Sequence, residues 1–185
     1  DRVRGVMFTG STEVATLLQR NIASRLDAQG RPIPLIAETG GMNAMIVDSS
    51  ALTEQVVVDV LASAFDSAGQ RCSALRVLCL QDEIADHTLK MLRGAMAECR
   101  MGNPGRLTTD IGPVIDSEAK ANIERHIQTM RSKGRPVFQA VRENSEDARE
   151  WQSGTFVAPT LIELDDFAEL QKEVFGPVLH VVRYN

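Results

Sequence analysis

Apolar residues recur at intervals of three and four positions in four long stretches of this chain. That spacing places them on one face of a helix, whereas short apolar runs bounded by turn residues predict strands. We expect helices over residues 12–29, 56–68, 84–99 and 117–133. We expect strands over residues 6–8, 35–37, 44–47, 75–80, 137–138, 156–162 and 178–182.

Strands that alternate with long helices are typical of an α/β fold with a mostly parallel sheet, because each parallel connection needs a crossover element. The polar and charged stretch over residues 142–153 interrupts this pattern and predicts a solvated surface loop. No internal repeat or low-complexity tract is present in the sequence.

Composition narrows the class of protein. A hydrophobic content of 43% supports a packed core, and a net charge of −5 argues against a nucleic-acid surface, which needs clustered Lys and Arg. No apolar run is long enough to span a bilayer. The chain starts at Asp1 without Met or a signal peptide and stops on a strand-like run, so we expect a piece of a longer protein.

The three cysteines, Cys72, Cys79 and Cys99, show neither CxxC pairing nor metal-ligand spacing with the three histidines. An odd number of cysteines without a disulfide framework indicates a reducing compartment. We therefore expect no metal site and a cytoplasmic location.

Cys72 is the first candidate for chemistry, because Gly69-Gln70-Arg71 places it on a turn between a helix and a strand. A cysteine on such a turn is exposed and can act as a nucleophile once it gains thiolate character. An arbitrary cysteine is more often a buried packing residue, and Cys79 and Cys99, in a strand and on a helical stripe, fit that description.

Glu38 is the second candidate. It follows the apolar run Pro34-Leu35-Ile36-Ala37 and precedes Thr39-Gly40-Gly41, so we expect a carboxylate at the end of a buried strand. Burial would raise its pKa and suit it to general-base catalysis. An exposed loop glutamate is an equally good interpretation of the position alone.

Two further segments lie at element boundaries. Phe8-Thr9-Gly10-Ser11 joins a strand to a helix, where free amides can seat a phosphate, although Ser11 is equally an ordinary N-cap. It is not a GxGxxG fingerprint, so a standard Rossmann motif is not supported. Residues 173–178 form a turn into a strand and carry no functional signal by themselves.

Four strings, in this order, resemble the aldehyde dehydrogenase superfamily: FTGST at residues 8–12, ETGG at 38–41, FDSAGQRC at 65–72 and EVFGPVL at 173–179. Gly112-Pro113 and FVAPT at 156–160 are weaker matches, and the resemblance extends over essentially the whole chain. The strings AETGGMNAMIVDSSAL and GQRCSALRVLCLQ look like the Δ1-pyrroline-5-carboxylate dehydrogenase branch, as found in bifunctional proline-catabolic enzymes of bacteria. Thr39 and Met42, where common members carry Leu and Lys, agree with this branch.

The resemblance implies an NAD-dependent oxidation of glutamate γ-semialdehyde to glutamate. Cys72 would attack the aldehyde carbon, and its own backbone N–H would help to hold the oxyanion. Glu38 would activate the water that releases glutamate from the thioester. Ser73 is similar to the serine that binds the substrate's α-carboxylate in this branch.

The resemblance also implies the cofactor contacts. Gly10 and Ser11 would lie against the pyrophosphate of NAD, Glu173 would hold the nicotinamide ribose, and Phe175 would pack beside that ring. No metal is implied.

At the scale of the chain, the resemblance implies a truncated three-layer aldehyde dehydrogenase-like fold. Residues 1–37 would be the end of the NAD-binding domain and residues 38–185 most of the catalytic domain. The parent would be a homo-oligomer with an FAD-dependent proline dehydrogenase domain, in some members with a DNA-binding segment. It would be cytoplasmic or peripheral at the inner membrane. We expect the isolated piece to be inactive, with no membrane or nucleic-acid contact of its own.

Two alternatives remain open. One keeps Cys72 and changes the substrate, as in a succinic-semialdehyde or broad aldehyde dehydrogenase; Ser73 and the Thr39/Met42 pair argue against it. The other is a non-catalytic scaffold with the same fold, which the presence of both Cys72 and Glu38 disfavours.

Overall fold

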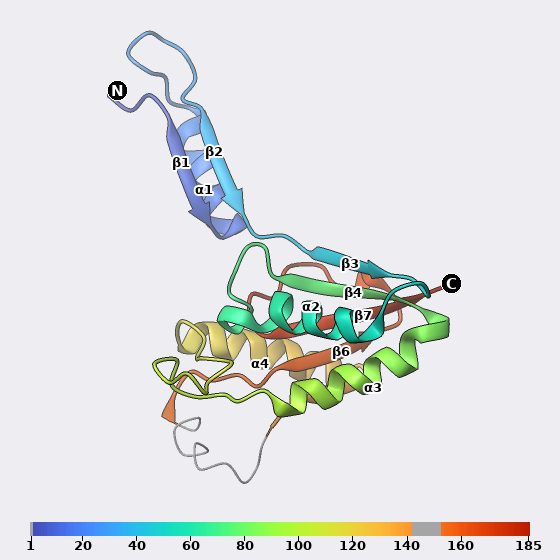
Figure 1. Cartoon of the computed structure of the whole chain (residues 1–185). Helices are drawn as coiled ribbons and strands as arrows, with labels where there is room; N and C mark the ends of the chain where they lie inside the picture. The colour runs from blue at the N-terminus through green and yellow to red at the C-terminus, as the bar shows by residue number, and fades with distance from the viewer. Residues whose placement is uncertain (1, 142–152) are drawn as a thin grey trace. The chain divides into compact units, whose positions relative to one another are not determined.

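Figure 1 shows the computed structural model, which describes residues 2–141 and 153–185. The loop expected over 142–153 lies almost wholly outside the described residues. Contacts within the chain divide it after Gly41 into two units.

The N-terminal unit is built on one parallel strand pair. β1 (Val6–Gly10) pairs with β2 (Leu35–Thr39), and α1 (Thr12–Ala23) connects them. Ser11 caps α1, since its hydroxyl accepts the N–H of Val14 at 3.2 Å. The strand-to-helix junction expected here is confirmed.

Helix α1 ends earlier than the apolar spacing predicts. It stops at Ala23, and the next residues turn around Asp27, whose carboxylate accepts the N–H groups of Gln29 and Arg31 at 2.8 and 2.9 Å. A carboxylate that bonds to backbone two residues later favours a turn over helix. The expected extension to residue 29 is therefore wrong.

The C-terminal unit contains a five-stranded sheet in the order β3-β4-β7-β6-β5. The strands are β3 (Asn43–Val47), β4 (Leu75–Gln81), β5 (Val137–Gln139), β6 (Thr160–Leu164) and β7 (Val178–Tyr184). β5 pairs antiparallel with β6, and the other three pairings are parallel. The mostly parallel α/β sheet is confirmed.

β6 begins later than expected. Val157 and Ala158 are buried without forming strand, and Pro159, which has no N–H to donate, immediately precedes the ladder. Only the second half of the apolar run over 156–162 therefore forms strand.

Helices cover the sheet in the C-terminal unit. α2 (Thr53–Phe65) and α3 (Asp82–Glu98) pack on each other and on the central strands β4 and β7, while α4 (Ser117–Ser132) packs beside β5 (Figure 1). Both central strands are buried on both faces over most of their length, as expected for parallel strands under helical layers.

Two short 3₁₀ helices complete the unit, η1 (Asp66–Gly69) and η2 (Phe167–Glu169). η2 was not expected; a capping box between Asp166 and Glu169 stabilises it. Among the described residues, no helix is long and apolar enough to cross a membrane.

Candidate active site

The predicted nucleophile lies on a tight turn. α2 ends at Phe65, and η1 follows with Ser67, Ala68 and Gly69 at φ values of 57°, 53° and 65°. Left-handed backbone is unfavourable for Ser and Ala, so the surrounding contacts must hold it in place. Cys72 comes three residues later, ahead of β4, and it is exposed as expected.

Two features of the structure favour glycine at position 69. Its φ of 65° lies in the left-handed region, and a Cβ there would lie 2.9 Å from the carbonyl oxygen of Ala64 and closer still to that of Gly176. A Cβ on Gly176 would in turn meet the side chain of Ile123 in α4. The string around Cys72 and the string EVFGPVL therefore pack backbone against backbone.

Arg76 joins the same two strings, although it is in the first half of β4 and only 1% exposed. Its Nε donates to Oε1 of Glu173 at 3.0 Å, and Nη2 forms an ion pair with the same oxygen at 2.9 Å. Phe175 lies over the guanidinium, 5.1 Å from ring centroid to Cζ. Burial lowers the pKa of Arg76, and the adjacent Glu173 carboxylate opposes this effect.

The remaining donors of Arg76 hold the turn itself. Nη1 donates to the carbonyl oxygens of Gly69 and Gly176 at 2.7 and 3.2 Å. Nη2 also donates to the carbonyl oxygen of Arg71 at 3.0 Å. A charge buried in this way is compensated by one carboxylate and three carbonyls.

Asn43 and Gln70 fix the turn from two other sides. The Asn43 amide in β3 donates to the carbonyl oxygen of Cys72 at 2.7 Å and to that of Ala74 at 3.0 Å. The Gln70 side chain accepts the N–H of Ile115 at 2.8 Å and donates to the carbonyl of Pro113 at 3.3 Å. The weakly matching Gly112-Pro113 turn is thus attached to the turn that carries Cys72.

Arg71 does not point at its neighbour Cys72. Its guanidinium donates to the carbonyl oxygens of Ala62 and Ser63, at 2.8 and 3.3 Å, near the end of α2. Arg71 and Ser73 line a pocket of about 450 Å³ beside the turn. Ser73 is exposed and available to a ligand there.

The other two cysteines are packing residues, as the sequence predicts. Cys79 lies in β4, and burial raises the pKa of its thiol. Cys99 follows α3, and its thiol donates to the Ala95 carbonyl at 3.7 Å. Both are half-buried against the hydrophobic core.

The predicted base and phosphate seat belong to the N-terminal unit. Thr9 pairs with Glu38, and Gly10 with Thr39, so Gly10, Ser11 and Glu38 meet at the carboxyl end of one parallel strand pair. Glu38 is exposed, however, and β2 is not a buried strand. The expectation of a desolvated carboxylate is therefore wrong for this unit taken by itself, because a two-stranded sheet with one helix cannot bury both faces.

Glu38 and Cys72 lie in different units of the chain, on either side of Gly41. Within the second unit, the structure brings Glu173 and Phe175 together with the Cys72 turn through Arg76. The meeting of Glu38 with Cys72 stays a prediction.

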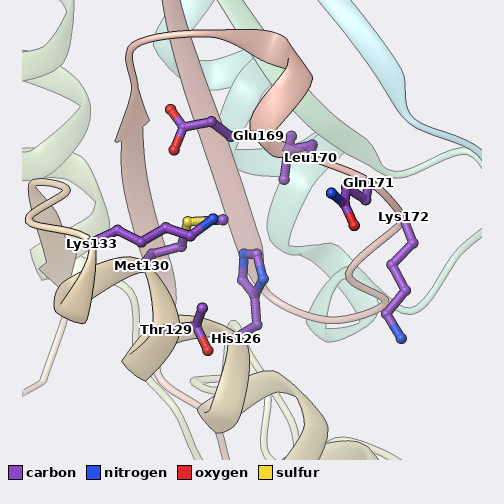
Figure 2. A pocket seen from close by; sticks show the side chains of 8 residues that line it. All are labelled: His126, Thr129, Met130, Lys133, Glu169, Leu170, Gln171 and Lys172. Carbon is purple, nitrogen blue, oxygen red and sulfur yellow. The ribbon is translucent and has the colours of Figure 1, made fainter.

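A second pocket, of about 430 Å³, lies between α4 and residues 169–172 (Figure 2). Eight residues line it: His126, Thr129, Met130, Lys133, Glu169, Leu170, Gln171 and Lys172. None of them is a predicted site residue, so the pocket does not bear on the Cys72 chemistry directly.

His126, in this second pocket, bonds to His180 of β7, with 2.8 Å between their Nε2 atoms. Nδ1 of His180 is 3.2 Å from the Arg76 carbonyl oxygen, which can only accept, so this nitrogen carries the proton and His126 donates to Nε2. Burial first, then the neighbouring His126, lowers the pKa of His180 to about 3. His180 is therefore a neutral residue that fixes the backbone of Arg76.

Sequence reasoning missed Arg76, Asn43 and His180. A signal was present for Arg76, because it is a single cation inside the apolar run 75–80, where an unpaired charge would be costly. Asn43 and His180 gave no comparable signal, since an uncharged side chain in or beside a strand does not indicate a particular partner.

The exposed Cys72 turn is joined through Arg76 to the segment that carries Glu173, beside a mostly parallel sheet, and this arrangement is the one expected of an aldehyde dehydrogenase chain. The family model described as the aldehyde dehydrogenase family matches residues 1–185, and the chain belongs to that family.

More particular similarities point to one group within the family. The chain is 94% identical over 184 residues to bifunctional protein PutA of Salmonella typhimurium and 89% identical over 185 residues to that of Klebsiella aerogenes. It spans 100% of its own length but only 14% of each of these relatives.

Solved structures agree. A crystal structure of bifunctional proline utilization A matches 98% of this chain and 18% of its own, with a TM-score of 0.87 and 48% identity. Betaine aldehyde dehydrogenase from Staphylococcus aureus in complex with NAD+ matches 98% of this chain and 35% of its own, with a TM-score of 0.88 and 29% identity. The expected aldehyde dehydrogenase-like fold is confirmed.

Proposed function

We propose that this chain is the nucleophile-bearing part of an NAD-dependent dehydrogenase that oxidises glutamate γ-semialdehyde to glutamate in proline catabolism. The observation that carries the proposal is the 94% identity to PutA over the whole chain. The proposal is also supported by Cys72, which is exposed on a turn that Asn43 holds in place and is therefore accessible to an aldehyde.

In this proposal Cys72, as a thiolate, attacks the aldehyde carbon and forms a thiohemiacetal. The N–H of Cys72 would stabilise the oxyanion as it develops. Ser73 would orient the substrate through its α-carboxylate. After oxidation leaves a thioester on Cys72, Glu38 would take a proton from the water that hydrolyses it.

NAD, when bound, supplies the hydride acceptor for this reaction. The residues present fit such a group. Within the described chain, the hydrogen bond and the ion pair that Arg76 makes with Glu173 both use Oε1, so Oε2 can accept from a ribose hydroxyl. Phe175 is 45% exposed and offers a flat face beside that carboxylate. Gly10 and Ser11 at the start of the twelve-residue α1 offer helix amides to a pyrophosphate.

The wider assignments belong to the same proposal. Residues 1–37 would close an NAD-binding domain and residues 38–185 would form most of the catalytic domain, close to the division observed after Gly41. The full-length protein, meaning a PutA-type polypeptide that contains these residues, would be a cytoplasmic homo-oligomer. FAD would bind only its separate proline dehydrogenase domain.

The test is a comparison of substrates on the full-length protein. We expect kcat/KM for glutamate γ-semialdehyde to exceed that for succinic semialdehyde, because the carboxylate of succinic semialdehyde lies one carbon closer to the aldehyde and would not meet Ser73 when the aldehyde is at Cys72. Cys72→Ala should abolish NADH formation from both. Equal kcat/KM values would favour a broad aldehyde dehydrogenase, and turnover by the Cys72→Ala variant would contradict the proposal.

A further inference from the structure

We propose that Arg76 is a positioning residue that couples the cofactor-binding segment around Glu173 to the backbone of the Cys72 turn. This role rests on the proposed function, since it assumes that Glu173 and Phe175 contact NAD. It goes beyond that function, because Arg76 would touch neither substrate nor cofactor.

The first argument is the distribution of its bonds. On one side the guanidinium binds the Glu173 carboxylate and stacks on Phe175. On the other side it binds the carbonyl oxygens of Gly69 and Arg71, which flank Gln70 in the nucleophile turn. Because the planar guanidinium binds both segments at once, a movement of one segment must shift the other.

The second argument is the energetic cost. Replacing a buried ion pair with apolar residues of similar volume is often neutral or stabilising, so packing alone does not require a charge at a site that is 1% exposed. The turn supplies a reason for the charge, because Ser67 and Ala68 are left-handed and their backbone needs external bonds. A planar guanidinium can donate to several carbonyl oxygens and a carboxylate at once, whereas a Lys ammonium cannot reproduce this geometry.

The third argument concerns the backbone of Arg76 itself. His180 donates from Nδ1 to its carbonyl oxygen, and the next residue, Val77, pairs with Ala44 of β3 and with His180 of β7. The backbone of Arg76 is therefore fixed beside a paired position of a central strand, and its guanidinium reaches from there to both segments.

The experiment measures two quantities in the full-length protein for wild type, Arg76→Lys and Arg76→Met. The first is KM for NAD beside kcat, and the second is the rate of Cys72 alkylation by iodoacetamide with and without saturating NAD. Arg135→Met is the control, because Arg135 is likewise an ion-paired arginine of the same unit, bound to Glu169 and Asp165, but makes no recorded contact with the turn.

In wild type and Arg135→Met, NAD should change the alkylation rate of Cys72 to the same extent. In both Arg76 variants this change should be lost, and KM for NAD should rise about tenfold as Glu173 loses its orientation. If circular dichroism shows that Arg76→Met does not fold, the Arg76→Lys result decides.

Three outcomes would overturn the role. Arg76 variants with wild-type KM and a wild-type response of Cys72 to NAD would show that no coupling exists. An equal loss in Arg135→Met would show that the effect is general destabilisation. A wild-type protein that neither binds NAD nor reacts at Cys72 would contradict the proposed function, and the role of Arg76 with it. The first two outcomes contradict only the role of Arg76, because in them the wild-type protein still binds NAD and reacts at Cys72.

Discussion

At the residue scale, the position of the Cys72 sulfur depends on side chains that bind the neighbouring backbone. Asn43 binds the carbonyl of Cys72, and Arg76 binds the carbonyl of Arg71 just before it. Arg71, the nearest cation in sequence, is turned back toward α2. The exposure of Cys72 therefore follows from backbone geometry.

We expect iodoacetamide to label Cys72 in preference to Cys79 and Cys99. Cys72 is exposed, whereas the other two are half-buried and burial raises the pKa of Cys79, which lowers its thiolate fraction at neutral pH. Peptide mass spectrometry after brief labelling measures the ratio. Preferential labelling of Cys79 or Cys99 would contradict the assignment of the nucleophile.

His180 should make the C-terminal unit sensitive to acid. Its pKa is lowered from 6.5 to about 3 in the folded protein, so below pH 6.5 the unfolded chain binds a proton that the folded chain does not. Stability is then present above pH 6.5 and is lost as the pH falls toward 3. At pH 5 the loss is about 2 kcal/mol relative to pH 7.

His180→Asn removes this titration and keeps a donor near the Nδ1 position. Hydrogen exchange of β7 peptides, corrected for intrinsic rates, should show a smaller decrease in protection between pH 7 and pH 5 in the variant. An identical decrease in both proteins would assign the acid sensitivity to other groups.

At the element scale, the turn between α2 and β4 is the feature that positions the site. Its left-handed residues come directly after a regular helix, and Gly69 touches the backbone of Gly176. Two of the four strings that resemble the family, FDSAGQRC and EVFGPVL, therefore pack against each other.

Gly69→Ala should abolish or greatly reduce activity while the sheet remains folded. An added Cβ meets two carbonyl oxygens and must displace either Gly176 or the turn. Gly134→Ala is the matched control, since its φ is 77° and no atom lies within 4 Å of the added Cβ. It should cost about 1 kcal/mol of stability and leave kcat unchanged. Equal effects of the two variants on kcat would contradict this account of Gly69.

The sequence predicted the elements better than it predicted their ends and contacts. Helical and strand spacing located α2, β4 and β7, because buried periodic positions dominate those runs. It overextended α1, where side chain to backbone bonds at Asp27 end the helix. The lone charge of Arg76 indicated that it has a partner, but the sequence could not show that the partner is Glu173, which only folding brings close. The bond from Asn43 to the Cys72 carbonyl was hidden for the same reason.

At the scale of the whole molecule, the chain spans only 14% of the length of the PutA of Salmonella typhimurium. Within the described residues, its N-terminal unit has a single parallel strand pair with exposed apolar residues such as Met7 and Ile36. In the proposed function, the rest of an NAD-binding domain would cover such surface.

We expect the isolated 185-residue chain to have no measurable dehydrogenase activity with NAD and glutamate γ-semialdehyde. The reason is that Glu38 needs burial to act as a base, and the two-stranded unit leaves it exposed. Steady-state NADH formation measures this, with the full-length protein as the positive control. Robust turnover by the isolated chain would show that these residues are sufficient.

The central claim is that Cys72 carries the acyl group and Glu38 drives its hydrolysis. The most direct measurement is rapid mixing of full-length Glu38→Gln with NAD and glutamate γ-semialdehyde, followed by peptide mass spectrometry. We expect one burst of NADH per site, little further turnover, and a glutamyl adduct on Cys72. Wild-type turnover by the variant, or an adduct on any other residue, would contradict the claim.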